Sequence, residues 1–277
     1  MKLLKNSRQS KLGIMGVGFV GGATANYYQK HRPDVKLYKY DKYKNIGSVG
    51  EVNQADVIFI CVPTPFHPSK GFDVSAVLQA VLVLTGKKTV VIRSTVVPGT
   101  TEGLQKKFPQ HKFLFNPEFL KQATANHDFI YPDRQIVGYT KASKTLANKV
   151  LKLLPKAPFS KALPATEAEV VKYMGNAFLA MKVVFANEFY DLCKALGINY
   201  EEVKQAVGKD KRITSSHLNV AQDGYRGYGG GCFPKDVNAI IQFARSKKAR
   251  LLLLESMRHV NRGLLSQSGF NEELFLK

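Results

Sequence analysis

The chain has 277 residues, 44% of them hydrophobic, and a formal net charge of +20. Its length can bury one large core or two ordinary ones, but no apolar run reaches the roughly 18 residues of a membrane span, and no signal peptide is evident. The cationic residues are dispersed, which favours a basic surface that attracts phosphorylated ligands over a nucleic-acid partner. Three scattered cysteines indicate neither a disulfide framework nor a metal site, and we expect a cytoplasmic protein.

The first half of the chain alternates short apolar runs with segments of helical pattern. Strands are predicted at residues 12–17, 35–41, 55–63, 89–95, 112–117 and 134–138. Helices are predicted between most of them, including 74–84 and 101–108. This alternation predicts an α/β domain over residues 1–162 with a Rossmann-type, doubly wound parallel sheet.

Strand patterns end after a helix predicted at residues 143–154. Three prolines then predict a linker: Pro155, Pro158 and Pro164. One long helix follows, with Thr166 and Glu169 as a possible capping box and Gly197 as its C-cap. Further helices are predicted at residues 200–207, 236–247 and 251–265. We therefore expect an all-helical domain with a long central helix over residues 163–265, and a tail over residues 266–277.

A glycine-rich stretch joins the first predicted strand to a helical segment. Its glycines at positions 16, 18 and 21 fit G-x-G-x-x-G, the turn that brings a pyrophosphate to a helix N-terminus. Asp41 ends the second strand, where a carboxylate can bind both ribose hydroxyls and favours NAD over NADP. A ligand-free turn and an ordinary turn aspartate are the alternatives. The predicted cofactor positions here are Gly16, Gly18, Phe19, Val20, Gly21 and Asp41.

The stretch YGGGCFPKD at residues 228–236 carries chemistry in the helical half. Its glycines let a ligand approach the backbone, and Cys232, Lys235 and Asp236 follow at the start of a helix. Cationic neighbours and a helix N-terminus favour the thiolate, so the pattern favours a reactive Cys232 over a buried structural cysteine. Cys61 and Cys193 lie in an apolar strand and in a helix, as core residues do.

Polar residues also follow several predicted strands: Pro63-Thr64, Ser94-Thr95 and Asn116-Pro117-Glu118. Because doubly wound folds bind ligands at the carboxyl ends of their strands, these residues are candidates for a site. Lys172 and Asn176 stand four residues apart on the long helix and share one face. From spacing alone, a solvated lysine and an ordinary helical asparagine are favoured.

Eight stretches occur in the order typical of one family: GVGFVG, CVPTP, STVVPGTTE, NPEFL, YPDR, AEVVKYMGNAFLAMKVVFANE, DKRI and GYGGGCFPKD. Over residues 11–245 the chain thus resembles the UDP-glucose/GDP-mannose dehydrogenase family. The resemblance implies NAD-dependent, four-electron oxidation of a nucleotide sugar, UDP-glucose to UDP-glucuronate, through a thiohemiacetal and a thioester on Cys232. It also implies a homodimer joined through the central region.

The resemblance assigns roles residue by residue. Lys172 and Asn176 would stabilise an oxyanion, Asp236 would assist proton transfer through water, and Glu118 would help to hydrolyse the thioester. Thr64 and Thr95 would line the nicotinamide side, with Thr95 also among the catalytic residues. The remaining cofactor positions would be Pro63, Ser94, Gln122 and Lys235. The substrate positions would be Phe119, Leu120, Lys172, Asn176, Arg212, Tyr228 and Gly229, with Arg212 contacting substrate in its own or in the neighbouring subunit.

The chain departs from the family at three places. It stops before the family's third, C-terminal nucleotide-binding domain, Gln122 stands where Glu is usual, and the connection over residues 41–55 is short. GDP-mannose is the alternative substrate. Two other classes of function stay open: a non-catalytic dinucleotide-binding subunit completed by a second chain, and a basic protein associated with nucleic acid.

Overall fold

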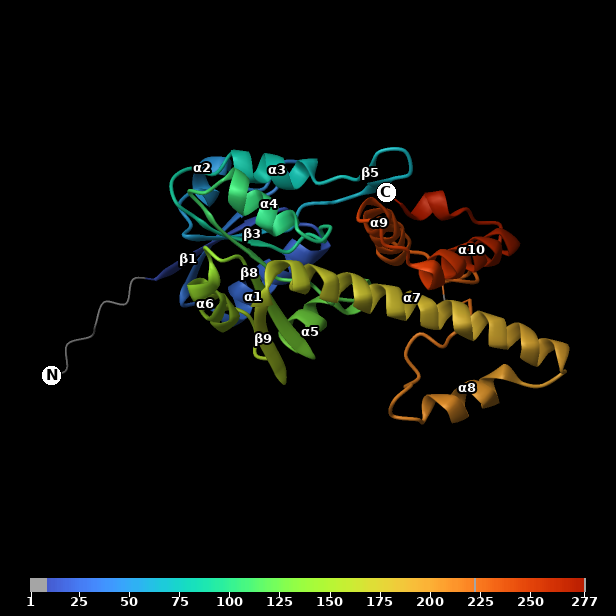
Figure 1. Cartoon of the computed structure of the whole chain (residues 1–277). Coiled ribbons are helices and arrows are strands. Elements are labelled where there is room, and N and C mark those ends of the chain that lie inside the picture. Colours follow the sequence, from blue (N-terminus) through green and yellow to red (C-terminus); the bar gives the residue numbers. More distant parts are fainter. Residues whose placement is uncertain (1–8, 222, 277) are drawn as a thin grey trace. The chain divides into compact units, whose positions relative to one another are not determined.

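The computed structural model describes residues 9–221 and 223–276. These residues form two compact units (Figure 1). The first comprises the described residues up to Thr64 together with Val74–Lys172, and the second comprises Pro65–Asp73 and the described residues from Tyr173 onward. The domain division expected between residues 162 and 163 stays a prediction.

The described strands of the first unit form one seven-stranded sheet in the order β2-β1-β3-β6-β7-β8-β9. Their bounds are β1 Ser10–Met15, β2 Val35–Tyr40, β3 Val57–Ile60, β6 Thr89–Ile92, β7 Lys112–Phe115, β8 Arg134–Tyr139 and β9 Phe159–Pro164. Strands β2, β1, β3, β6 and β7 are mutually parallel, so their carboxyl ends meet at one edge of the sheet. The predicted Rossmann-type sheet is therefore confirmed.

Two strands differ from the prediction. β8 runs antiparallel to β7, although the sequence predicts a parallel sheet throughout. β9 occupies the segment predicted as a linker and pairs in parallel with β8. It is the edge strand of the sheet, where proline is tolerated because its missing N–H can face away from the ladder, and Pro164 is its last residue. The prolines thus mark an edge strand, and the linker prediction is wrong.

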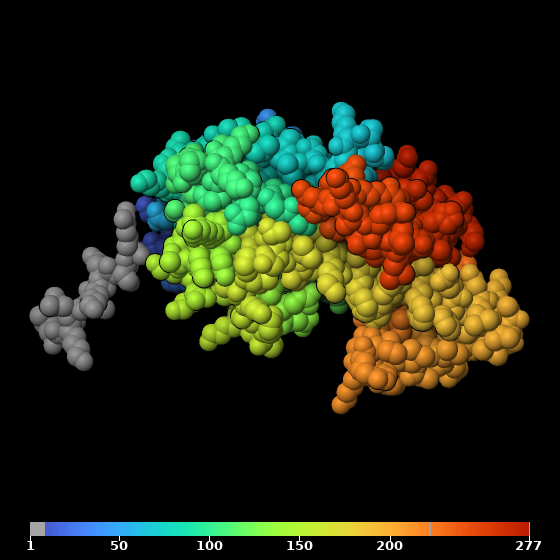
Figure 2. Space-filling view, viewed as in Figure 1, coloured from blue at the N-terminus to red at the C-terminus, as the bar shows by residue number. Residues whose placement is uncertain are grey.

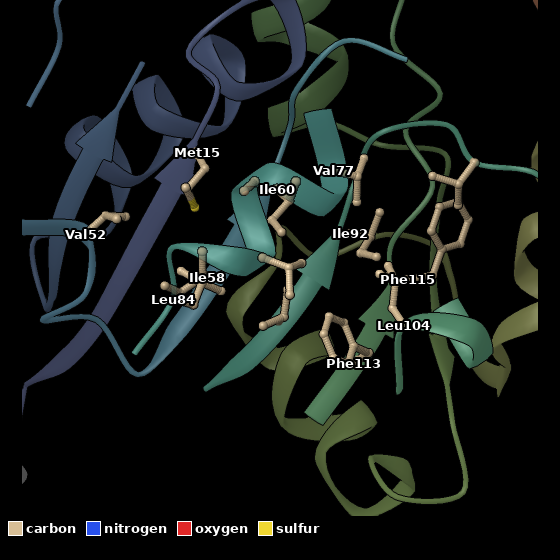
Figure 3. Close-up of a cluster of buried hydrophobic side chains, with 14 of the residues drawn as sticks. Met15, Val52, Ile58, Ile60, Val77, Leu84, Ile92, Leu104, Phe113 and Phe115 are labelled. Carbon is tan, nitrogen blue, oxygen red and sulfur yellow. The ribbon is translucent and has the colours of Figure 1, made fainter. Parts of the chain in front are cut away.

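Helices cover both faces of this sheet. They are α1 Phe19–His31, α2 Val49–Val52, α3 Ser75–Leu82, α4 Thr100–Lys107, α5 Ala125–Ile130 and α6 Ala147–Leu153, with 3-10 turns η1 Gln122–Thr124 and η2 Lys144–Leu146. Alternate residues of β3 enter opposite layers of the core. Ile58 and Ile60 join one cluster, shown in Figure 3, whereas Phe59 packs in another cluster with Tyr28 of α1. Burial on both faces explains the continuous apolar run in the sequence.

The second unit is mostly helical. Helix α7, Ala165–Ala195, starts in the first unit and continues into the second, where α8 Tyr200–Gly208, α9 Phe233–Ser246, α10 Leu252–Gln267 and the 3-10 turn η3 Glu272–Phe275 follow. A hairpin of β4 Phe66–His67 and β5 Gly71–Phe72 also belongs to this unit. Strands of two residues are too short to give a sequence pattern, so the sequence did not predict them. No helix in residues 9–221 or 223–276 is long and apolar enough to span a membrane.

Of the two caps predicted for α7, one is wrong and the other is confirmed. The predicted capping box is wrong, because the helix already begins at Ala165 and the Glu169 carboxylate instead accepts hydrogen bonds from the N–H groups of Gly99 and Thr101. Glu169 thus caps the N-terminus of α4. The predicted C-cap is confirmed: Gly197 has φ 68°, and its N–H and that of Ile198 close a Schellman motif on the last turn.

Candidate functional site

The glycine-rich turn joins β1 to α1 at the carboxyl edge of the sheet. Gly16 has φ 86°, in the left-handed region, and a Cβ there would lie 2.7 Å from the carbonyl oxygen of Cys61. A Cβ on Gly21 would lie 1.8 Å from the carbonyl oxygen of Gly16, so α1 can approach the turn this closely only with glycine. At Gly18, in contrast, a Cβ would meet nothing within 4 Å. The turn is therefore tight on the protein side and open beside Gly18, as close approach of a phosphate requires.

Asp41 follows β2, and its carboxylate is bonded to the glycine-rich turn. Oδ2 accepts a hydrogen bond from the Val17 N–H at 2.7 Å, and Oδ1 accepts from the N–H groups of Tyr43 and Lys44 at 3.0 and 3.1 Å. Lys44 Nζ donates to the Val17 carbonyl at 2.8 Å. A carboxylate offers about four lone-pair sites and these three bonds use three of them, so Asp41 can still accept a bond from one ribose hydroxyl.

The strand ends of β3 and β6 are tied together by their hydroxyl groups. Thr64 Oγ1 donates to the Thr95 carbonyl at 2.8 Å, and Ser94 Oγ donates to the Val62 carbonyl at 2.6 Å. Pro63, between these bonds, is exposed. No side chain among the described residues caps the N-terminus of α1, whose first turn carries no acidic residue. An uncapped helix N-terminus, an open glycine and a fixed carboxylate together fit a dinucleotide.

Glu118 and Lys172 form a buried ion pair in the first unit. Lys172 Nζ donates to Glu118 Oε1 at 2.5 Å and to the Glu118 carbonyl oxygen at 2.7 Å, while Oε2 accepts from the Leu120 N–H at 2.9 Å. Burial would raise the pKa of Glu118, but the Lys172 charge and hydrogen bond, helped by the Leu120 N–H and by Arg93, hold that pKa below its usual value. Lys172 is 4% exposed, so the solvated lysine favoured by spacing alone is wrong.

Cys232 immediately precedes α9, and its side chain is exposed. Asp236, in the first turn of α9, is 1% exposed; its Oδ2 accepts from Asn176 Nδ2 at 2.6 Å, and its Oδ1 accepts from Lys235 Nζ. Lys235 also lies over the ring of Phe72, 5.3 Å from its centroid. The helix N-terminus and the Lys235 charge make this end of α9 favourable for a thiolate. Asn176 is therefore a buried hydrogen-bond partner of Asp236, and the ordinary helical asparagine favoured by spacing alone is wrong.

Several further predicted residues lie at the surface or only partly buried. The guanidinium of Arg134 stacks 3.8 Å from the centre of the half-buried Phe119 ring. Gln122 begins η1 and is exposed. Arg212 is also exposed and pairs with Asp210. The structure leaves Phe19, Val20 and Leu120 at partly exposed positions.

Tyr228 has a different environment. Its side chain is 2% exposed and belongs to the core of the second unit, and its main-chain N–H and C=O are both bonded to the side chain of Asn261, at 2.7 and 3.0 Å. A Cβ on the neighbouring Gly229 would lie 2.4 Å from the Tyr225 hydroxyl oxygen. The guanidinium of Arg226, in the same loop, donates hydrogen bonds to the side chain and the carbonyl oxygen of Asn187. This loop is thus anchored by packing on both sides of the glycine run.

Arg93, a buried cation beside the strand ends, was not among the residues predicted from the sequence. Its side chain is 3% exposed, Nη1 donates to Asn116 Oδ1, and its guanidinium lies 4.9 Å from the Phe129 ring centre. Burial lowers its pKa, which the neighbouring Cys61 and Glu118 partly oppose. A cation directly before Ser94-Thr95 was visible in the sequence, but its burial depends on residues far along the chain.

The glycine turn, the acid after the second strand and the parallel sheet define a dinucleotide-binding α/β protein. Residues 35–154 match the NAD binding domain of the UDP-glucose/GDP-mannose dehydrogenase family, and residues 166–263 match the central domain of that family. The chain therefore belongs to the UDP-glucose/GDP-mannose dehydrogenase family. The expected cofactor, NAD, agrees with the domain that is matched.

Individual relatives agree with this assignment. The UDP-glucose 6-dehydrogenase of Rickettsia prowazekii is 35% identical over 231 residues, which cover 80% of this chain and 52% of that protein. The corresponding protein of Haloferax volcanii is 34% identical over 250 residues, 83% of this chain and 57% of that one. A solved UDP-glucose dehydrogenase from Pyrobaculum islandicum superposes with a TM-score of 0.81 at 30% identity, covering 94% of this chain and 70% of that chain. The chain thus spans about half the length of the curated relatives it matches.

Proposed function

We propose that this protein catalyses the NAD-dependent oxidation of a nucleotide sugar, UDP-glucose to UDP-glucuronate. The observation that carries the proposal is that one helix holds two buried polar residues, Lys172 bonded to Glu118 and Asn176 bonded to Asp236. Burying such groups costs stability compared with an apolar core, so a mere scaffold has no physical need for them. Relatives named UDP-glucose 6-dehydrogenase support the choice of substrate.

NAD binds, in this proposal, at the glycine-rich turn. Gly18 and the N–H groups of Phe19 and Val20, at the N-terminus of α1, would hold the pyrophosphate, and Asp41 would accept a hydrogen bond from the ribose. The nicotinamide side is lined by Thr64 and Thr95. Pro63, Ser94, Gln122 and Lys235 complete the proposed contacts. Bound NAD supplies the hydride acceptor for each of the two oxidations.

The first oxidation removes a proton and a hydride from the primary alcohol of the sugar and leaves an aldehyde. Asp236 takes up the proton through a water molecule. Lys172 and Asn176 donate hydrogen bonds to the oxygen as its negative charge develops, and preorganised donors of this kind supply much of an enzyme's rate enhancement. The residues proposed to hold the substrate are Phe119, Leu120, Arg212, Tyr228 and Gly229.

The second oxidation depends on Cys232. Its thiolate adds to the aldehyde carbon and forms the alkoxide of a thiohemiacetal, which loses a second hydride to become a thioester. Glu118 assists the attack of water on the thioester carbon, the C–S bond breaks, and the products are the carboxylate, the free thiolate and two protons. Two hydrides leave the same carbon, so two molecules of NAD are reduced for each sugar.

The stoichiometry of NADH formation tests this function. Purified protein is incubated with NAD and either UDP-glucose or GDP-mannose, and NADH absorbance is followed together with the sugar consumed. We expect two NADH per UDP-glucose. Two NADH per GDP-mannose with none from UDP-glucose would assign the alternative substrate, and no NADH from either sugar would contradict catalysis by this chain alone.

A second candidate function is a dinucleotide-binding subunit that a partner chain completes. It needs only the glycine-rich turn and Asp41, which are hydrogen-bonded to each other within the first unit. It predicts NAD binding without turnover, and activity that appears only when a chain supplying the nucleotide-binding domain is added. Calorimetric titration with NAD, with and without such a chain, separates the two functions.

We further propose a homodimer joined through α7. In the second unit this helix exposes five large apolar side chains by between 43% and 74%: Met174, Phe178, Phe185, Phe189 and Leu192. Their spacings of four, seven, four and three residues place them on one face, and an exposed apolar face of this extent marks an interface. Light scattering should give the mass of two chains for the wild type and of one chain for Phe178→Glu with Phe185→Glu. A monomeric wild type would contradict the dimer.

A further inference from the structure

The amino edge of the sheet in the first unit carries exposed lysines on neighbouring segments. Lysine 87 precedes β6, two lysines end α4, one begins β7, and two follow β8, which runs antiparallel and so ends at this same edge. We call these residues the lysine edge: Lys87, Lys106, Lys107, Lys112, Lys141 and Lys144. They lie opposite the carboxyl edge, where the cofactor turn is found.

Hydrogen bonds show that these segments adjoin one another. The Lys112 N–H donates to the Lys88 carbonyl at 2.8 Å, which links the starts of β7 and β6. Gln105 of α4 accepts from the Phe113 N–H at 3.0 Å, and Ser143, between the two lysines after β8, donates to the Phe113 carbonyl at 2.6 Å. In Figure 2 the green surface of α4 borders the yellow-green surface of the segment after β8. The lysine edge is therefore one continuous surface.

The charge of this surface is not compensated. The segments that build it, residues 84–89, 104–113 and 139–146, contain no Asp or Glu. None of the ion pairs found in the described part of the chain includes a residue of the lysine edge. Two acids flank it: Asp56, whose carbonyl accepts from the Thr89 N–H on the neighbouring strand, and Glu102, four residues before Lys106 on α4. Like charges that lie close together repel one another, and binding of an anionic partner reduces that repulsion.

Two exposed aliphatic residues flank the lysine edge at the end of α3. Leu82 is 65% exposed and Val83 is 39% exposed. The Val83 carbonyl accepts from Asn53 Nδ2 at 2.9 Å, and Lys88 Nζ donates to the Asn53 carbonyl at 2.5 Å, so the helix end and the start of β6 meet at one residue. The surface thus combines ammonium groups with aliphatic side chains.

This combination distinguishes two anionic partners. A lipid bilayer offers headgroup phosphates to the lysines and an acyl boundary to Leu82 and Val83. A nucleic acid offers phosphates only, and binding of its unpaired bases uses exposed aromatic rings. The segments of the lysine edge expose no aromatic residue, since Phe108, Phe113 and Tyr139 are all buried or half-buried. The chemistry favours the lipid surface.

We infer that the lysine edge binds an anionic lipid bilayer, so that the protein associates peripherally with a membrane surface. Each lysine near such a surface contributes about fivefold in affinity, and six act together. The attraction is electrostatic and weakens with salt, because charges are screened over about 10 Å at 0.1 M ionic strength. The inference does not depend on the proposed reaction, and it accounts for part of the net charge of +20.

Flotation with lipid vesicles tests the inference on the full chain. Vesicles of phosphatidylcholine alone are compared with vesicles containing about 30% phosphatidylserine, at low salt and in about 0.5 M NaCl. We expect binding only to the anionic vesicles and its loss in high salt. The triple variant Lys112→Glu, Lys141→Glu, Lys144→Glu should bind about a hundredfold more weakly, at about fivefold for each lysine lost.

A matched control separates the lysine edge from net charge. The triple variant Lys194→Glu, Lys209→Glu, Lys247→Glu changes the charge equally at exposed lysines of the second unit and should keep its vesicle affinity within about fivefold. Urea unfolding confirms that each variant is folded. Leu82→Ser with Val83→Ser leaves every charge in place and should weaken vesicle binding without altering binding to duplex DNA. Three results would each overturn the inference. They are equal losses of vesicle affinity in the two triple variants, no vesicle binding by the wild type, and an affinity for DNA that exceeds the affinity for vesicles and is unchanged in Leu82→Ser with Val83→Ser.

Discussion

The glycine-rich turn makes opposite predictions for two glycines three residues apart. Gly18→Ala places a methyl group where no atom lies within 4 Å, at an ordinary φ of −79°. Alanine is less favourable than glycine at an N-cap by about 0.5–1 kcal/mol, so the free energy of unfolding should fall by no more than about 1 kcal/mol. Gly21→Ala places its methyl 1.8 Å from a backbone oxygen, and relieving that overlap should cost about 1–3 kcal/mol or more.

The two variants should also differ in how their affinity for NAD falls. The Gly18 methyl stands where the pyrophosphate is proposed to approach, so affinity should fall at least about tenfold, or about 1.4 kcal/mol, in a folded protein. Gly21→Ala should lose affinity together with stability. Urea unfolding without ligand and calorimetric titration with NAD measure the two quantities separately. Unchanged NAD affinity in a folded Gly18→Ala variant would refute the proposed position of the cofactor.

Three further predictions concern α7. Burial raises the pKa of Glu169 to about 7, above its ordinary 4.5, so its contribution to stability is present below pH 4.5 and is lost, by about 3 kcal/mol, as pH rises to about 7. Urea titrations at several pH values should show this slope in the wild type and not in Glu169→Gln. Gly197→Ala puts a Cβ at φ 68° and should destabilise by about 1–2 kcal/mol, whereas Gly103→Ala, an open helical position, should not. Lys172→Met leaves the Glu118 charge buried and unpaired and should cost about 3–5 kcal/mol, of which adding Glu118→Gln should recover part; no loss would contradict the ion pair.

Local patterns predicted the parts of this fold that local chemistry decides. The glycine turn, the β3 run and the Gly197 cap each depend on residues within one or two elements, and their positions were predicted closely. The partners of α7 were not predictable in this way: Lys172 meets Glu118 across 54 positions, Asn176 meets Asp236 across 60, and Glu169 reaches Gly99 across 70. Helical spacing shows that two residues share a face but not what covers it.

The strands that escaped prediction were short or at an edge. Pro158 precedes β9 and Pro164 is its last residue, whereas β4 and β5 have two residues each. None of these three strands shows the alternation or the continuous apolar run of a buried strand. Their pairing is set by the strands and helices around them. The burial of the Tyr228 side chain likewise depends on residues far along the chain, such as Met257 and Leu264, which pack in the same cluster.

The central claim is that one cysteine joins two oxidations, and Cys232→Ser tests it most directly. The variant changes one exposed atom and should unfold in urea like the wild type and bind NAD equally well. Incubated with NAD and UDP-glucose, the wild type should yield UDP-glucuronate with two NADH per sugar. The account predicts no UDP-glucuronate from Cys232→Ser, with Cys193→Ala, a change at a buried cysteine, retaining product formation. UDP-glucuronate formed by Cys232→Ser at the wild-type rate would contradict the thioester mechanism.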